Sequence, residues 1–144
     1  KPRQLVIVNR TLERAQELAK DVRLFYNIPV KAESIDSVNK NLCPKDLCIQ
    51  TTSVGLHPKD EESPIRNEDF FNGVKAAVDL IYNPSETLFL KMARKSGCKT
   101  VNGFGMLFFQ AIKAYEIWNE ITIPKIYVDK LFIKLKNELE EGIS

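Results

Sequence analysis

The sequence has few of the residues that metal sites and disulfide frameworks need. Its 144 residues include one histidine and three cysteines. His57 stands alone beside Pro58, whereas a metal site needs several clustered ligands. The cysteines Cys43, Cys48 and Cys98 form no C-x-x-C pair, and their odd number predicts reduced thiols that pack as small hydrophobic side chains. The composition therefore predicts no metal centre and no disulfide scaffold.

Long apolar runs and a strong charge of one sign are also missing. No run approaches the roughly 18 apolar residues that a bilayer span requires, and no signal-peptide pattern is present. The net charge is only +2, and lysines and arginines are spread along the chain rather than gathered in blocks. We expect a cytoplasmic protein of about one domain, with neither nucleic acid nor membrane as a partner.

What the sequence does contain is a regular alternation of strand-like and helix-like segments. The expected strands are 5–8, 29–32, 46–50, 76–81 and 98–101. The expected helices are 12–22, a short one capped by Ser34, one that starts at Ser85 or Thr87 and ends at Ser96, and two long ones at about 105–120 and 124–141. Thr11 is expected to cap the first helix. This alternation predicts an α/β fold with a parallel sheet flanked by helices.

Polar clusters follow four of the expected strands. They are Asn9-Arg10-Thr11, Thr51-Thr52-Ser53, Tyr82-Asn83-Pro84 and Asn102-Gly103. Open parallel sheets bind ligands beyond the carboxyl ends of their strands. The four clusters therefore predict one ligand site at that edge of the sheet.

The first cluster indicates which ligand. In dinucleotide folds an acidic residue at the end of the second strand binds the ribose of NAD, whereas arginine there accommodates the 2′-phosphate of NADP. Here the neutral Asn9 is followed by Arg10, and Arg14 lies one helical turn further on. Two guanidinium groups at a helix N-terminus make an anion site. The alternative is an exposed Arg14 paired with Glu13 or Glu17, which would carry no function.

The other clusters have structural alternatives as well. Residues 51–53 with Gly55 would let a ligand approach the backbone, but they also suit an ordinary turn. Tyr82 could point its hydroxyl group into a cleft or pack as a core aromatic. Gln110, one turn beyond Met106, interrupts an apolar helix and could be a plain surface residue.

Taken together, the four clusters resemble the C-terminal half of the shikimate dehydrogenase family in order and spacing. The matching motifs are N-R-T-x-x-[RK]-A at 9–15, [NT]-[AT]-[TS]-x-x-G, whose last five positions fall at 51–55, D-x-x-Y-x-P-x-x-T at 79–87 and D-G-x-G-M-L-x-x-Q-A at 102–111. Two positions depart from the family: Gln50 stands where asparagine is frequent, and Asn102 stands where aspartate is frequent. Neither is expected to carry chemistry.

The resemblance implies an NADP-dependent reduction of 3-dehydroshikimate to shikimate, in aromatic amino acid biosynthesis. The implied cofactor-binding residues are Asn9, Arg10, Thr11, Arg14, Thr51, Thr52, Ser53, Leu80, Gly103 and Met106. The first four of these would hold the 2′-phosphate, and the last three would lie near the nicotinamide. The implied substrate-binding residues are Tyr82 and Gln110.

The resemblance also implies that several parts of the family are missing from these 144 residues. The chain begins at Lys1 without an initiator methionine, which indicates a piece of a longer protein, although a processed or renumbered chain would begin in the same way. As a Rossmann-like domain, residues 1–144 would lack the first strand, the glycine-rich loop and the first helix. The family's catalytic lysine and aspartate have no counterpart here, so we expect no catalytic residue in this chain, no turnover and weak NADP binding at best.

A missing central strand would leave residues 5–8 and 47–50 each with an open edge. Because apolar edges are prone to aggregation, we expect the two strands to pair directly, or the gap to be filled by another chain through self-association. Two other functions stay open: a quinate/shikimate dehydrogenase, and a nucleotide-binding or interaction module without chemistry.

Overall fold

The computed structural model describes residues 2–40 and 45–141. Its strands are β1 (Leu5–Asn9), β2 (Val30–Ser34), β3 (Leu47–Gln50), β4 (Ala76–Asp79) and β5 (Lys99–Val101). Its helices are α1 (Leu12–Phe25), α2 (Ile35–Lys40), the short 3-10 helix η1 (Glu68–Phe71), α3 (Leu88–Lys95), α4 (Phe104–Asn119) and α5 (Lys125–Glu141). In the part of the chain that is described, no helix is both long and apolar enough to cross a membrane.

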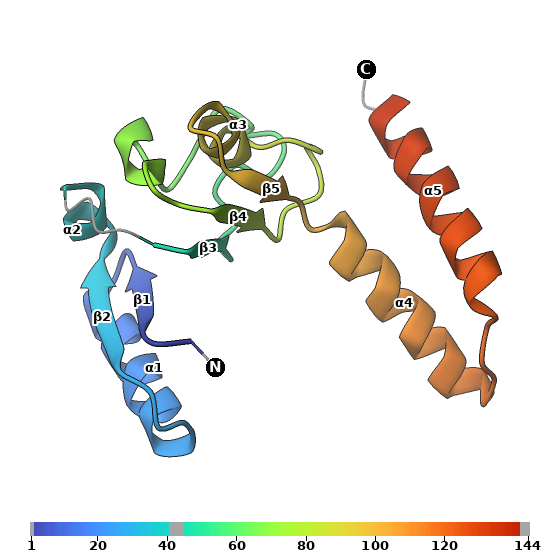
Figure 1. Ribbon diagram of the computed structural model, residues 1–144, viewed down its shortest axis with the longest axis horizontal. Coiled ribbons are helices and arrows are strands. Elements are labelled where there is room, and N and C mark those ends of the chain that lie inside the picture. Colours follow the sequence, from blue (N-terminus) through green and yellow to red (C-terminus); the bar gives the residue numbers. More distant parts are fainter. Residues whose placement is uncertain (1, 41–44, 142–144) are drawn as a thin grey trace.

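The strands form two parallel sheets, and the predicted α/β class is confirmed. β1 pairs with β2 in one sheet, and the other sheet has the order β3-β4-β5. Leu5 is opposite Val30 in the first sheet, and Leu47 is opposite Ala76 in the second. Figure 1 shows the two sheets side by side, with α1 against the first and α3 against the second.

Direct pairing of β1 with β3, one of the two arrangements expected from the sequence, is not found, and a gap filled by another chain stays a prediction. The two strands belong to different sheets, and neither is hydrogen-bonded to the other. Each sheet is fixed by its own covering helix, and the two sheets meet through α2, where Val38 joins the core and Val8 and Ile35 pack against it.

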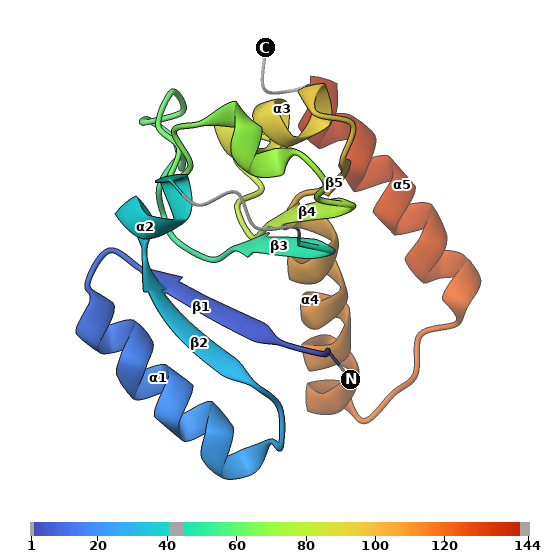
Figure 2. The ribbon, with the colours of Figure 1, turned by 60° about the vertical axis from the view of Figure 1, so that its left-hand side comes forward.

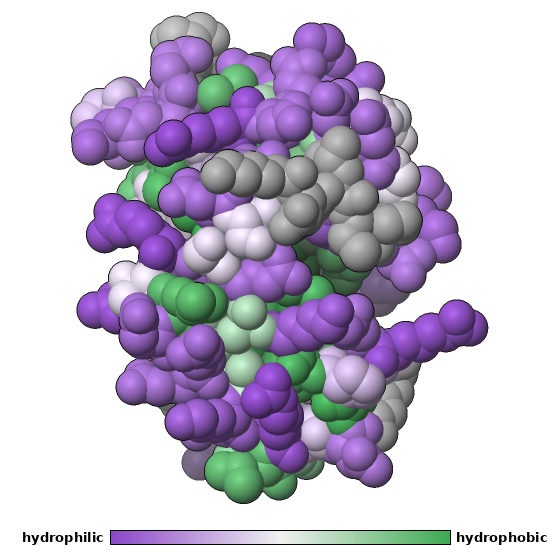
Figure 3. Space-filling view, turned by 90° about the vertical axis from the view of Figure 1, so that its left-hand side faces the viewer, coloured by the Kyte–Doolittle hydropathy of each residue, from purple (hydrophilic) through white to green (hydrophobic). Residues whose placement is uncertain are grey.

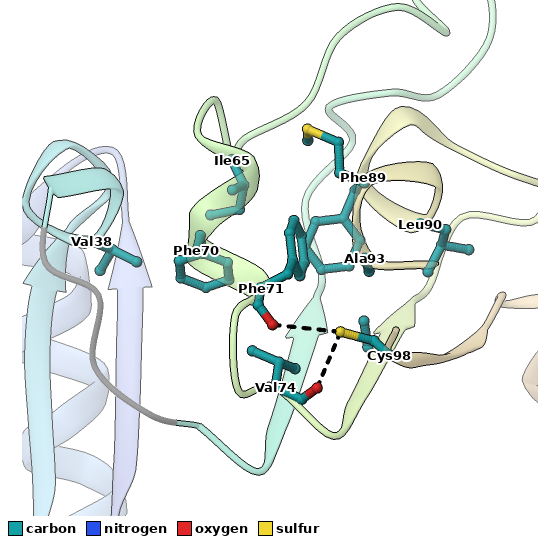
Figure 4. Packing of buried hydrophobic residues seen from close by; sticks show 11 residues of the cluster. Val38, Ile65, Phe70, Phe71, Val74, Phe89, Leu90, Ala93 and Cys98 are labelled. Atoms are coloured by element: carbon teal, nitrogen blue, oxygen red, sulfur yellow. Dashed lines mark hydrogen bonds between the residues drawn. The ribbon is translucent and has the colours of Figure 1, made fainter. Parts of the chain in front are cut away.

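The main core lies under the three-stranded sheet. Phe71 packs edge-to-face against Phe70 and Phe89, with ring centroids 5.1 and 5.2 Å apart. Cys98 is buried beside them, and its thiol donates to the carbonyl oxygens of Phe71 and Val74 at 3.8 and 3.2 Å (Figure 4). The expectation that Cys98 packs as a small buried side chain is thus confirmed, whereas Cys43 lies outside the described residues.

The two-stranded sheet and α1 have a much thinner core. Only Ala15, Ala19 and Val30 are buried there. β1 was expected to be buried on both faces, but Val6 is 40% exposed, because no neighbouring strand or helix covers it. Figure 3 views this side of the molecule, and hydrophobic side chains reach the surface in its lower half.

Helices α4 and α5 form an antiparallel hairpin (Figures 1 and 2), which lies to one side of the strands in Figure 1. Phe132 of α5 stacks on Phe104 and Phe109 of α4 at centroid distances of 5.5 and 5.3 Å. Glu116 joins the helix to the following turn, because its carboxylate accepts from the Ile123 N–H at 2.9 Å and pairs with Lys113 at 3.0 Å.

The helix caps agree with the sequence in two cases and differ in one. Ser34 Oγ accepts from the Ser37 N–H at 3.2 Å, and Thr87 Oγ1 accepts from the Leu90 N–H at 3.3 Å. Thr11 occupies the N-cap position of α1, but its side chain makes no cap hydrogen bond. Its own N–H donates to Asn9 Oδ1 at 2.9 Å.

Candidate functional site

Three of the four polar clusters are joined by backbone hydrogen bonds. The Leu80 N–H donates to the Gln50 carbonyl at 3.0 Å, the His57 N–H donates to the Asn83 carbonyl at 3.4 Å, and the Gly103 N–H donates to the Ile81 carbonyl at 2.9 Å. The loops that follow β3, β4 and β5 therefore form one connected surface beyond the carboxyl ends of these strands. This is the arrangement that the sequence pattern predicted for the three clusters.

The loop after β3 is folded by Gln50, which is only 4% exposed. Its Oε1 accepts from the Thr52 N–H, and its Nε2 donates to the Val54 carbonyl at 3.0 Å. Thr52 Oγ1 in turn accepts from the Val54 N–H at 3.2 Å. A side chain that was expected to carry no chemistry thus shapes the loop and leaves residues 51–53 exposed.

The loop after β4 is held by a buried network. Asp79 and Thr87 are both fully buried. The Asp79 carboxyl group accepts from Thr87 Oγ1 at 2.6 Å and from the Ile81 N–H at 3.0 Å. Burial raises the pKa of Asp79, and these two hydrogen bonds oppose that rise only in part. The network fixes both ends of the segment that carries Tyr82.

Gly103 allows the third loop to approach the second. A Cβ atom at this position would lie 1.9 Å from the carbonyl oxygen of Leu80, so no other residue fits. Asn102 adds a further link, since its Nδ2 donates to the Ser85 carbonyl at 2.8 Å and its Oδ1 accepts from the Phe104 N–H at 3.2 Å. The backbone of Leu80 and the start of α4 are therefore locked together.

The first cluster lies on the other sheet, at the end of β1. Arg10 and Arg14 are exposed, and neither makes an ion pair within residues 2–40 and 45–141. The pairing of Arg14 with Glu13 or Glu17, which the sequence left open, is absent from the structure. The two guanidinium groups stand free beside the N-terminus of α1.

The two residues expected near the substrate, Tyr82 and Gln110, are both exposed. Tyr82 is 40% exposed, so it is not the core aromatic that the sequence left open. Gln110 is exposed on α4, one turn beyond Met106, which is 50% exposed. No hydrogen bond in the described part of the chain joins Gln110 to Tyr82.

Sequence reasoning missed the supporting residues rather than the exposed ones. Gln50, Asp79 and Thr87 are the buried polar side chains of the described residues. Thr87 was expected only to start a helix and Asp79 only as part of a motif, and their spacing of eight residues gave no sign of a direct contact. One signal was available in the sequence. Gln50 and Asp79 are polar residues at the ends of β3 and β4, and a buried polar side chain needs a hydrogen-bond partner.

Comparison with known proteins gives a consistent result. No protein-family model matches the chain. Shikimate dehydrogenase (NADP(+)) from Methanococcus aeolicus is 40% identical over 130 residues, which are 90% of this chain and 46% of that protein. This chain therefore spans about half the length of the relative.

Solved structures agree with this similarity. A chorismate mutase/shikimate 5-dehydrogenase fusion protein from Clostridium acetobutylicum has a TM-score of 0.76 and 39% identity, over 95% of this chain and 46% of that one. A shikimate dehydrogenase in complex with NADP+ has a TM-score of 0.75 and 32% identity, over 98% of this chain and 47% of that one.

Proposed function

We propose that this chain, which is homologous to about half of each shikimate dehydrogenase that it matches, is the NADP-binding half of such an oxidoreductase. The whole enzyme would reduce 3-dehydroshikimate to shikimate with NADPH. Residues 1–144 would form one Rossmann-like nucleotide-binding domain that lacks its first strand, glycine-rich loop and first helix.

The observation that carries the proposal is the free pair of guanidinium groups at the end of β1. Arg10 and Arg14 make no ion pair among the described residues, although Glu13 and Glu17 are close in sequence. Cations at a helix N-terminus oppose the helix dipole, so a bound anion would stabilise this arrangement. A 2′-phosphate is such an anion, and the neutral Asn9 and Thr11 would complete its contacts.

The joined loops fit the other end of the cofactor. Thr51, Thr52 and Ser53 are exposed on a loop that Gln50 shapes, so they can flank a ligand. Gly103 brings the start of α4 against the backbone of Leu80, and Met106 stands half-exposed on the next turn. When bound, a nicotinamide supplies hydride transfer. The part of this chain would be to orient the ring and to exclude water from one side.

Tyr82 and Gln110 would contact the substrate from this half. The buried hydrogen bond from Thr87 to Asp79 holds the backbone on both sides of Tyr82 in place. We therefore expect the position of the Tyr82 side chain to be restricted. Gln110 lies on the half-exposed face of α4, near Met106. No residue of this chain is assigned a proton-transfer role, and we expect the chain alone not to turn over. Shikimate-dependent formation of NADPH by the purified chain would contradict this.

A cytoplasmic location is part of the proposal. Among the described residues Cys48 and Cys98 are free thiols, as is usual in a reducing compartment.

The test compares NADP+ with NAD+ in a fusion of this chain to the half of the Methanococcus aeolicus enzyme that it does not cover. Arg10→Ala and Arg14→Ala should each lower the affinity for NADP+ by at least about tenfold, because each removes a charge-assisted hydrogen bond to phosphate. The affinity for NAD+ should change little. Lys20→Ala on the exposed side of α1 is the matched control. Equal losses for NADP+ and NAD+ would overturn the assignment of the two arginines.

A further inference from the structure

The outer edge of β2 has no partner strand. Among residues 2–40 and 45–141, β2 pairs only with β1, so one of its two edges is unpaired. Figure 1 shows α1 behind the two strands rather than beside this edge, and Figure 3 looks at the side of the molecule on which β2 lies. An unpaired strand edge is a template for pairing with another chain. Which chain it accepts depends on its backbone groups and its side chains.

The hydrogen-bond register shows which backbone groups of β2 face outward. The Leu5 N–H donates to the Pro29 carbonyl at 2.9 Å, so the backbone groups of Pro29 face β1. Backbone groups of successive strand residues face opposite sides. Those of Val30, Ala32 and Ser34 therefore face the outer edge, where they can pair with a further strand.

The middle of the outer edge is accessible from the side of α1. A hollow of about 320 Å³ borders it there, lined by Gln16, Ala19, Lys20, Arg23 and Ala32. The Arg23 guanidinium donates to the outward-facing Val30 carbonyl. A carbonyl oxygen has two lone pairs, so this bond leaves room for a second donor. The edge at Ala32 can therefore be approached by another backbone.

On its other face, β2 carries opposite charges two residues apart. Lys31 is exposed and Glu33 is partly buried. Neither makes an ion pair among the described residues, although Glu33 Oε2 accepts from the Ser37 hydroxyl group at 3.4 Å. Side chains two residues apart in a strand lie on the same face. The edge therefore presents one positive and one negative charge side by side.

This pattern fits a second copy of β2 in antiparallel orientation. A two-fold axis sets the residues of one copy against those of the other in reverse order. With the axis at Ala32, the outward groups of Ala32 meet their own counterparts, and those of Val30 meet those of Ser34. In the same register, Lys31 lies directly opposite Glu33 of the second copy, and this pair occurs twice.

Charge favours this register over its neighbours. An axis at Lys31 would set the two copies of Lys31 against each other, and an axis at Glu33 would set glutamate against glutamate. Opposite charges directly across an antiparallel pair are stabilising, whereas like charges are destabilising. An axis between two residues would set outward backbone groups against inward ones, so no ladder would form.

We propose that two copies of this chain associate through the outer edges of β2, antiparallel and centred on Ala32, so that their two-stranded sheets join into one. This association does not depend on the proposed function. The pairing is short, and it brings Lys20 and Arg23 of both copies toward the same axis. We therefore expect a weak dimer that forms reversibly as the protein concentration rises.

The first test is a charge exchange, measured by analytical ultracentrifugation of this chain between about 1 μM and 1 mM. Lys31→Glu and Glu33→Lys each set like charges against one another twice, and each should raise the dissociation constant of the dimer by at least about tenfold. The double variant restores opposite charges and should return to within about threefold of wild type. Lys99→Glu, on the edge strand β5, is the matched control and should change nothing.

The second test removes an outward N–H. Ala32→Pro deletes the donor at the axis in both copies, and the dimer should not form at the highest concentration. The same N–H is not part of the pairing with β1, so the variant should keep its fold. Circular dichroism checks this.

Hydrogen exchange of the unaltered chain decides the case in which the proline variant fails to fold. The amides of Ala32 and Ser34 should exchange with solvent deuterium rapidly in dilute protein and at least about tenfold more slowly where the dimer forms. The Thr100 amide is the control, because the Lys99 N–H donates to the Lys75 carbonyl and Thr100 therefore faces the outer edge of β5. Its exchange should stay the same.

Four results would each overturn the proposal. They are a monomer at every concentration, a dimer that both single charge variants leave unchanged, a double variant as weak as the single ones, and protection of Thr100 in place of Ala32.

Discussion

The two sheets of this protein differ in how completely each is built. The three-stranded sheet has an aromatic core, buried hydrogen bonds under its loops and three polar clusters tied together. Among the described residues, the two-stranded sheet has three small or medium buried side chains, and Arg10 and Arg14 of its polar cluster make no ion pair. The loops after β3, β4 and β5 are therefore held together within the chain, whereas the two arginines of the proposed site are not.

The two regions differ in which groups supply the contacts that hold their side chains in place. Around β4 the chain supplies its own partners, so that the Asp79 carboxyl group and the Gln50 amide are satisfied internally. Around β1, Arg10 and Arg14 make no ion pair among the described residues, and we expect their partner to be the phosphate group of the proposed cofactor. We therefore expect the region around β4 to unfold at a higher free energy than the region around β1, and the region around β1 to respond more strongly to ligands and partners.

The largest expected effect comes from the aromatic core. Phe89→Ala removes a ring that is 1% exposed and packs on Phe71, and it should lower the free energy of unfolding by about 3–5 kcal/mol. Phe25→Ala is the control in α1, where the ring is 80% exposed and the change should stay within about 0.5 kcal/mol. Urea denaturation measures both. Similar losses for the two variants would show that the two regions are equally packed.

The joined loops should give the next effect. Gly103→Ala places a Cβ atom 1.9 Å from the Leu80 carbonyl oxygen, so the loops after β4 and β5 must separate, at a cost of about 1–3 kcal/mol. Gly105→Ala is the matched control: its Cβ meets nothing closer than 4.0 Å, and helix propensity should make it neutral or stabilising by up to about 1 kcal/mol. If Gly103→Ala melts at the wild-type temperature, the close approach is absent.

The smallest effect is a pH dependence from Asp79. Burial raises its pKa in the folded state, so the folded protein favours the protonated carboxyl group. The contribution of the protonated Asp79 to the free energy of unfolding is fully present below the unfolded-state pKa and is lost as the pH rises through the folded-state pKa. Asp79→Asn should therefore gain stability relative to wild type as the pH rises above about 4, the ordinary pKa of an aspartate. A difference between the two proteins that is constant with pH would remove Asp79 as the cause.

Much of this fold follows from the sequence because its signals are local. Periodicity located each strand and helix to within a few residues, and Ser34 and Thr87 marked helix starts by their side-chain chemistry. The helix η1 was missed, because its two phenylalanines read as loop until the core that buries them is known. Open edges on β1 and β3 were expected, but direct pairing as a way to close the gap between them was not found, because the two strands lie in different sheets.

The candidate site was predictable to a similar extent. Its exposed residues were found because they follow strand ends, and three of the four clusters meet as expected. The buried polar residues that hold the loops in place were not found. Gln50, for example, hydrogen-bonds to the backbone of the loop after β3, and that loop takes its shape only when these bonds form. The freedom of Arg14 from Glu13 and Glu17 depends on side-chain geometry, which spacing along a helix leaves open. The roles of Tyr82 and Gln110 stay predictions.

Amide hydrogen exchange along β1 and β3 of the chain alone tests the central claim most directly. If the two strands flank an open gap, the amides of Val6, Val8, Leu47 and Ile49 will exchange rapidly, while those of Ile7 and Cys48, which face β2 and β4, will be protected. Protection at all six positions in the monomer would show that β1 and β3 pair with each other, and would contradict the account.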